Sequence, residues 1–117
     1  MKYFFRNEFA CKCGCGFNTV DYELANVLDD VRRFFDKPTL INSGCRCSEH
    51  NKAVGGSKNS QHLYGKAADI VVKGVSEEDV YQYLNEKYNS RYGIGLYNGR
   101  VHIDVKSGYR RRWNKKN

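Results

Sequence analysis

Two of the three histidines in this chain lie near aspartates, in a pattern that could hold a metal ion. His62 precedes Asp69 by seven residues, and Gly65 between them can reverse the chain so that the two side chains converge. His102 and Asp104 alternate with apolar residues, so in a strand they face the same way. Two imidazoles and one carboxylate are a common ligand set for catalytic Zn²⁺, and they leave a fourth position for water. The spacing alone also fits a surface histidine and a capping aspartate.

A longer pattern contains these residues, and it reads Ser60-x-His62-x-x-Gly65-x-Ala67-x-Asp69, followed later by Val101-His102-Ile103-Asp104. It resembles the zinc signature of the M15 peptidases, which are D-alanyl-D-alanine carboxypeptidases and related murein peptidases. This family shares a metal-site fold with hedgehog domains and lysostaphin-type enzymes. Residues 43–56 are similar to a second stretch of the family, and residues 8–11 and Trp113 resemble its small members, many of them from phages.

The resemblance implies one catalytic Zn²⁺ bound by His62, Asp69 and His102. It also implies hydrolysis of peptide bonds in peptidoglycan stem peptides or cross-links, of the D,D-carboxypeptidase or endopeptidase type, as in an endolysin. Arg46 matches the arginine upstream of the first ligand. Its guanidinium can grip a substrate carboxylate or stabilise an oxyanion, and a loop salt bridge is the alternative. Ser60 fits a role in contacting substrate or supporting a ligand, with a plain local turn as the alternative.

The general base is absent from the two positions that the resemblance suggests. Dipeptidases of the family have a glutamate where this chain has Gly99, and carboxypeptidases have a histidine where it has Arg100. Asp104 is the best local substitute, and it could instead orient an imidazole. His50 is the other candidate, and it could also cap its helix or bind substrate. The missing base leaves an alternative function, a catalytically weak or inactive zinc-containing module that binds the cell wall.

Five cysteines form two tight groups, Cys11, Cys13 and Cys15, and then Cys45 and Cys47. Disulfides between the groups would tie the N-terminal segment to the loop that carries Arg46. Free thiols would suit a reducing cytoplasm. A structural metal is the third interpretation, although spacing by a single residue is tighter than in most structural zinc sites. The odd number leaves at least one thiol unpaired in a monomer. All three interpretations are structural.

Three helices are predicted from the periodicity. Residues 21–35 carry an apolar face at helical spacing, and Asp21 or Thr19 can cap them. A short helix is expected over 48–54 and a longer one over 76–88, capped by Ser76. The apolar face of the first helix consists of Leu24, Val27, Leu28, Val31, Phe34 and Phe35.

Four strands are predicted, over residues 39–42, 67–72, 92–97 and 100–105. The last two form a hairpin at Asn98-Gly99, the strongest short hairpin signal. The first 18 residues look irregular or strand-like, with core candidates at Phe4, Phe5 and Phe9. The predicted fold class is α+β, a small and mostly antiparallel sheet packed with two to three helices. By resemblance, it carries a zinc site like that of hedgehog domains and D-Ala-D-Ala peptidases.

The length of 117 residues, 40% of them hydrophobic and 28% charged, predicts one domain over residues 1–117. No apolar stretch reaches the roughly 18 residues that a membrane span needs. The chain also opens without the apolar segment of a secretory signal, so we expect synthesis in the cytoplasm. The resemblance implies action at the bacterial cell wall, reached through a phage holin or as part of a virion. A monomer is expected.

The net charge of +7 is concentrated in a basic C-terminal tail over residues 106–117, which has six basic and no acidic side chains. Such a segment can attract nucleic acid, an anionic membrane or an anionic cell-wall polymer. It can equally be a solvated terminus. Because the charge is confined to one short stretch, no nucleic-acid partner is expected, and the expected partner is a peptidoglycan peptide.

Overall fold

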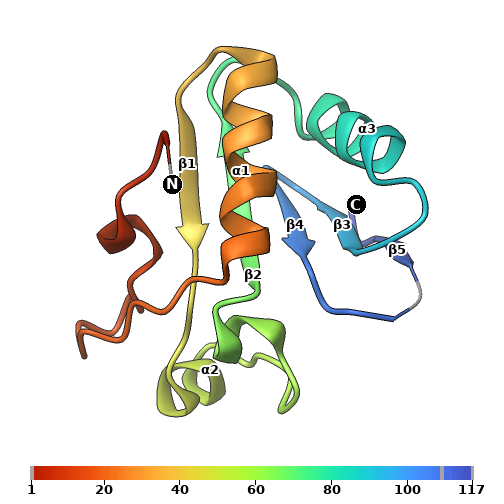
Figure 1. Cartoon of the computed structure of the whole chain (residues 1–117). Coiled ribbons are helices and arrows are strands. Elements are labelled where there is room, and N and C mark those ends of the chain that lie inside the picture. The colour runs from red at the N-terminus through yellow and green to blue at the C-terminus, as the bar shows by residue number, and fades with distance from the viewer. Residues whose placement is uncertain (1, 109, 117) are drawn as a thin grey trace.

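A five-stranded mixed sheet is the frame of the fold in the computed structural model, which describes residues 2–108 and 110–116 (Figure 1). The strands lie in the order β1 (Thr39–Ser43), β2 (Ala67–Val72), β4 (Arg100–Asp104), β3 (Gly93–Tyr97) and β5 (Arg111–Asn114). Neighbouring strands are antiparallel except β3 and β5, which are parallel. The predicted α+β class and mostly antiparallel sheet are confirmed, with one parallel pair added.

The helices follow the sequence periodicity to within one or two residues. α1 (Tyr22–Phe35) begins after Asp21, whose side chain accepts a hydrogen bond from the Glu23 N–H at 2.8 Å. α3 (Glu77–Lys87) begins after Ser76, which caps the Asp79 N–H at 3.1 Å. The short α2 (Ser48–Ala53) lies at the other end of the sheet from α3 (Figure 1). Two 3₁₀ turns, η1 (Arg6–Phe9) and η2 (Gln61–Tyr64), were not predicted.

The core contains most of the residues that the sequence placed there, with two exceptions. Phe4 and Phe9 are buried, but Phe5 is 78% exposed, because it stands just before the η1 turn while Phe4 takes the inward position. Phe34 is 59% exposed, so its assignment to the buried face of α1 was wrong. Its ring instead stacks on Tyr83 of α3, with ring centroids 3.9 Å apart. Both exceptions lie at an end of a helix or turn, where the periodic pattern constrains orientation least.

The two faces of the sheet have different roles. Ile70, Val101 and Ile103 belong to the hydrophobic core that also includes apolar side chains of α1 and α3. Asp69 and His102 alternate with these residues and therefore point to the other face. They are paired in register across β2 and β4, and the same row continues through all five strands. The row consists of Ser43, Asp69, His102, Gly95 and Trp113.

The C-terminal basic segment contributes a strand that the sequence did not predict. Residues 106–117 were expected to be a tail, of which 109 and 117 lie outside the described residues. Arg111–Asn114 instead forms β5 at the edge of the sheet. Arg112 donates hydrogen bonds to the backbone carbonyls of Tyr88 and Tyr92, at 2.7 and 2.8 Å. Positive charges in this strand therefore hold the fold together, in addition to any role with a partner.

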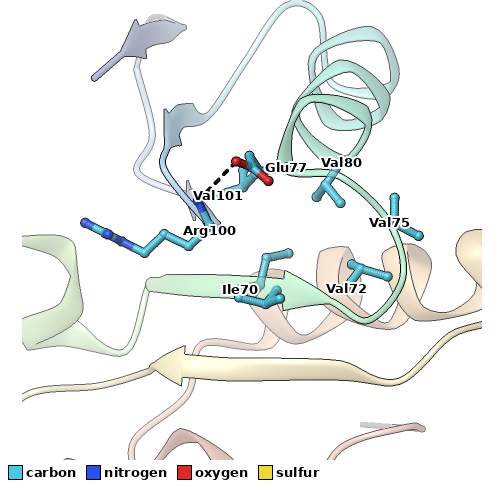
Figure 2. A pocket seen from close by; sticks show the side chains of 9 residues that line it. Ile70, Val72, Val75, Glu77, Val80, Arg100 and Val101 are labelled. Carbon is cyan, nitrogen blue, oxygen red and sulfur yellow. Dashed lines mark hydrogen bonds between the residues drawn. The ribbon is translucent and has the colours of Figure 1, made fainter. Parts of the chain in front are cut away.

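A small cavity lies between α3 and the helix-covered face of the sheet (Figure 2). Its volume is about 20 Å³, which is room for about one water molecule, and its walls include Val72, Val80 and Val101. The Glu77 carboxylate lies beside it and accepts a hydrogen bond from the Gly99 N–H at 3.2 Å. The cavity is too small to hold a peptide substrate.

In the described part of the chain, every helix is too short or too polar to cross a bilayer.

Candidate metal centre

The three predicted metal ligands come together on the open face of the sheet. His62 lies in η2, Asp69 on β2 and His102 on β4. His102 Nδ1 is 3.0 Å from Asp69 Oδ1, and His62 Nε2 is 3.5 Å from Asp69 Oδ2. One ligand atom of each side chain lies within 4.8 Å of the other two. Segments that are 33 residues apart in sequence thus converge on one point.

The turn that carries His62 is fixed by residues on both sides of it. Ser60 caps η2, and its Oγ accepts a hydrogen bond from the His62 N–H at 3.2 Å. Gly65 ends the turn in the left-handed conformation, with a φ of 67°, so the chain can enter β2 at once. The observed contact of Ser60 is the local turn; its contact with substrate stays a prediction.

Each histidine offers one nitrogen to a metal and has the other held by an acceptor. His62 Nδ1 lies 2.6 Å from the carbonyl oxygen of Gly44, and His102 Nε2 lies 2.9 Å from Asp104 Oδ2. With a metal ion bound at the other nitrogens, these acceptors would hold the N–H on His62 Nδ1 and on His102 Nε2. His62 Nε2 and His102 Nδ1 both face Asp69, and they are the nitrogens left to bind the ion. Metal-binding histidines are oriented in this way, so the donor set fits zinc.

The charges around the centre favour a cation. Burial alone would raise the pKa of Asp69, but hydrogen bonds from His102 and His62 outweigh it and hold that pKa well below its usual range. Burial would lower the pKa of His102, but the carboxylates of Asp104 and Asp69 outweigh it and raise that pKa. The same two carboxylates that favour a proton on His102 also favour a metal ion beside it.

Asp104 is fully engaged by its neighbours. Oδ2 accepts hydrogen bonds from His102 Nε2 at 2.9 Å and from Arg111 Nη1 at 3.1 Å. Oδ1 accepts from Arg111 Nη2 and from the Lys106 N–H. Burial opposes ionisation, yet His102 and Arg111 lower the pKa of Asp104 to about 2. Because a carboxylate has about four lone-pair sites, none is left for a substrate proton.

Two glycines on β3 let side chains from β5 reach the centre. A Cβ at Gly93 would overlap Asp104 and Arg111, and a Cβ at Gly95 would overlap the Trp113 indole. Arg111 therefore crosses β3 to Asp104, while the Trp113 ring lies 5.2 Å from the His102 ring. Sequence reasoning missed this support. The Gly-x-Gly pattern inside a strand was the available signal, because such glycines often mark a close approach of other groups.

Arg46 lies beside the carboxylate of the centre. Its Nη2 is 3.6 Å from Asp69 Oδ2, its Nε donates to Ser43 Oγ at 3.2 Å, and its Nη1 donates to Asn51 Oδ1 at 3.1 Å. A register shift between Ile41 and Ser43 brings Ser43 opposite Asp69. Asn51 is buried in α2 and also donates to a backbone carbonyl. Neither Ser43 nor Asn51 was predicted as a site residue.

An open groove lies next to Arg46. It has a volume of about 410 Å³, within the range of small-ligand pockets, and its walls include Phe17, Leu63 and Tyr64. His50 is half-buried in α2. Among the described residues, its imidazole makes no hydrogen bond or ion pair, and it does not join the three ligands. Arg46 thus lies beside the candidate metal centre and also lines a space where a peptide could lie.

These features describe an α+β protein with a His-Asp-His centre and an arginine at the edge of a groove. The sequence of residues 2–104 matches the family model described as Peptidase M15. Because that match covers most of the chain, the protein belongs to the M15 peptidase family, and the resemblance seen in the sequence is confirmed.

A curated relative points in the same direction over a shorter stretch. The chain is 51% identical to the zinc D-Ala-D-Ala carboxypeptidase of Streptomyces albus G over 35 residues. That stretch is 30% of this chain and 14% of the relative, so the chain spans only a small part of that protein.

Proposed function

We propose that this chain is a zinc peptidase that cleaves peptide bonds in peptidoglycan stem peptides or cross-links. The observation that carries the proposal is the convergence of His62, Asp69 and His102, each imidazole with one nitrogen held and one facing the shared carboxylate. When bound there, Zn²⁺ supplies Lewis-acid chemistry toward the scissile carbonyl and activates water near neutral pH. The M15 family match and the carboxypeptidase relative support this assignment.

Arg46 is the substrate-binding residue in this proposal. Its guanidinium lies 3.6 Å from Asp69, the residue also lines the groove, and hydrogen bonds to Ser43 and Asn51 hold it in place. A planar guanidinium can bind a carboxylate with two parallel hydrogen bonds, which suits the carboxyl end of a stem peptide. In the same place it can stabilise the negative charge that develops on the carbonyl oxygen.

Asp104 acts as a positioning residue for His102 and not as the general base. Its oxygens already accept four hydrogen bonds, and its low pKa makes it a weak base near neutral pH. Of the two candidates from sequence, His50 is left for proton transfer or for substrate contact.

Because the oxygens of Asp104 already accept four hydrogen bonds, this residue is not available as a general base. This favours a second candidate function, a zinc-containing module that binds the cell wall without hydrolysing it. For either function, we propose that the protein acts at the bacterial wall and that it is a monomer with a single domain. Phage origin, with release by a holin or from a virion, belongs to the same proposal. Anionic wall polymers would suit the net charge of +7.

Mass spectrometry of purified murein digested with the zinc-loaded protein tests the proposal. We expect new fragments that disappear with a chelator and return with added zinc, and their masses identify which bond is cut. His102→Ala should release none, while the exposed Lys73→Ala should behave as wild type. Retention on sacculi without any fragment would establish the binding module instead of the peptidase.

A further inference from the structure

A second group of metal-ligand side chains lies outside the candidate metal centre. Cys11, Cys13 and Cys15 come from the loop before α1, and Cys47 immediately precedes α2. The four sulfur atoms all lie within 4.8 Å of one another. Two segments 36 residues apart in sequence therefore bring four thiols to one point.

The separations between these sulfurs match a shared metal ion. Three of the pairs are Cys11–Cys13 at 3.4 Å, Cys13–Cys47 at 3.7 Å and Cys11–Cys47 at 3.8 Å. A tetrahedral zinc site has Zn–S distances of about 2.3 Å, which places its sulfurs about 3.8 Å from one another. A disulfide needs sulfurs at about 2.05 Å, and it would use only two of the four thiols.

The loop backbone is shaped to collect its three cysteines. In an extended strand, alternate residues are about 7 Å apart, too far for neighbouring ligands of one ion. Here Gly14 and Gly16 have φ values of 83° and 89°, which only glycine adopts readily, and they curl the chain. The Cys11 N–H donates to the carbonyl of Phe17 at 2.7 Å and closes the loop.

Backbone donors also point at two of the sulfurs. The Cys47 N–H lies 3.4 Å from Cys11 Sγ, and the His50 N–H lies 3.4 Å from Cys47 Sγ. Hydrogen bonds of this kind favour the thiolate, the form that binds metal. Cys13 and Cys15 are exposed, so an ion can reach the cluster from solvent.

We propose that Cys11, Cys13, Cys15 and Cys47 form a second metal site for a thiophilic divalent cation such as zinc. Four sulfur ligands close the coordination shell, so the site is structural and not catalytic. It joins the N-terminal loop to the segment that carries Arg46, which is next to Cys47 in sequence. Occupancy would therefore hold the substrate-binding arginine in place.

Cys45 is a natural control for this site. It is only 2% exposed, and its thiol donates a hydrogen bond to the Phe17 carbonyl at 3.1 Å. It does not belong to the four-sulfur group. Cys45→Ala removes one cysteine from the same region but leaves the proposed ligands intact.

Metal content and cobalt substitution of the full chain under a non-chelating reductant test the proposal. We expect two metal ions per wild-type chain and thiolate-to-cobalt charge-transfer absorption. His62→Ala/His102→Ala should keep one ion and this absorption. Cys13→Ser/Cys15→Ser should lose the absorption and one ion, and should keep the other ion at the candidate metal centre. Cys45→Ala should match wild type in both readouts.

The His62→Ala/His102→Ala variant separates this proposal from the proposed peptidase function, because it lacks the candidate metal centre but keeps all four thiols. If cobalt gives it no thiolate charge transfer, the second site does not exist. An intact mass that shows disulfides among the four cysteines in the metal-loaded protein would also overturn the proposal. Both measurements are made with the four cysteines present, so they hold even if the serine variant fails to fold.

Discussion

Replacement of Asp104 by asparagine tests the role of the buried support of His102. The substitution keeps the size of the side chain but removes its charge. The asparagine amide can donate to His102 Nε2, where the carboxylate accepted at 2.9 Å. His102 would then carry its proton on Nδ1, the nitrogen that faces Asp69, and would lose the lone pair proposed to bind zinc.

The expected magnitude follows from the contacts. Loss of a carboxylate that orients a metal-binding histidine typically lowers metal affinity about 10- to 100-fold. Arg111 also loses its charged partner. Since Asp104 is 1% exposed, removal of these charge-assisted hydrogen bonds should lower the free energy of unfolding by about 2–3 kcal/mol.

Zinc affinity is measured by competition with a chromogenic chelator, and turnover on murein fragments is measured at saturating zinc. We expect weaker zinc binding with most of the turnover recovered when zinc is in excess, because Asp104 positions His102 and does not carry the proton. Unchanged zinc affinity with abolished turnover would refute this reasoning and make Asp104 the general base.

Asp29→Asn is the matched control for that experiment. Asp29 is 9% exposed and accepts hydrogen bonds from the backbone of Lys2 and Tyr3, away from the candidate centre. The Asp29→Asn substitution should lower the free energy of unfolding and leave the zinc affinity unchanged.

Four further outcomes are expected. His62→Ala should lose both zinc and turnover, and full zinc with full turnover in this variant would show that the ligand assignment is wrong. Arg46→Ala should keep zinc yet lose about 10²- to 10³-fold in turnover, and normal kinetics would remove Arg46 from the mechanism. Gly95→Ala should lower stability by about 1–3 kcal/mol and change the Trp113 fluorescence, because the new methyl group overlaps the indole. In the zinc-free protein, the depressed pKa of Asp104 contributes stability above its unfolded pKa of about 3.9, and this is lost as pH falls toward about 2. As the pH is lowered over that range, the melting temperature of Asp104→Asn should therefore fall less steeply than that of the wild type.

The candidate centre was predictable from sequence where a local pattern set the direction of a side chain. Strand alternation placed His102 opposite the core, and a glycine turn brought His62 toward the strand that carries Asp69. The helices were predictable for the same reason, since apolar periodicity and a capping residue are both local signals.

The remaining support was not predictable, because it depends on pairing between distant segments. β5 is short, rich in arginine and without alternation, so nothing within its own residues marked Arg111 or Trp113 as neighbours of His102, and the glycines of β3 were the one indirect signal. Ser43 faces Arg46 only because of a register shift in β1. The cysteine spacing likewise left three interpretations open, since the approach of Cys47 to Cys11 depends on tertiary structure.

The row of residues across the five strands limits how the length of this chain can vary. In each strand, an insertion or deletion of one residue reverses the parity of every position beyond it. A change of that kind before His102 in β4 would turn the imidazole toward the hydrophobic core and bring a valine or isoleucine beside Asp69. Two-residue changes preserve parity, and an insertion at the 98–99 turn leaves the strands themselves unaltered, whereas a deletion there would break the Tyr97–Arg100 pair. Variation in length is therefore compatible with the centre in even steps within strands, or as insertions in the turns between them.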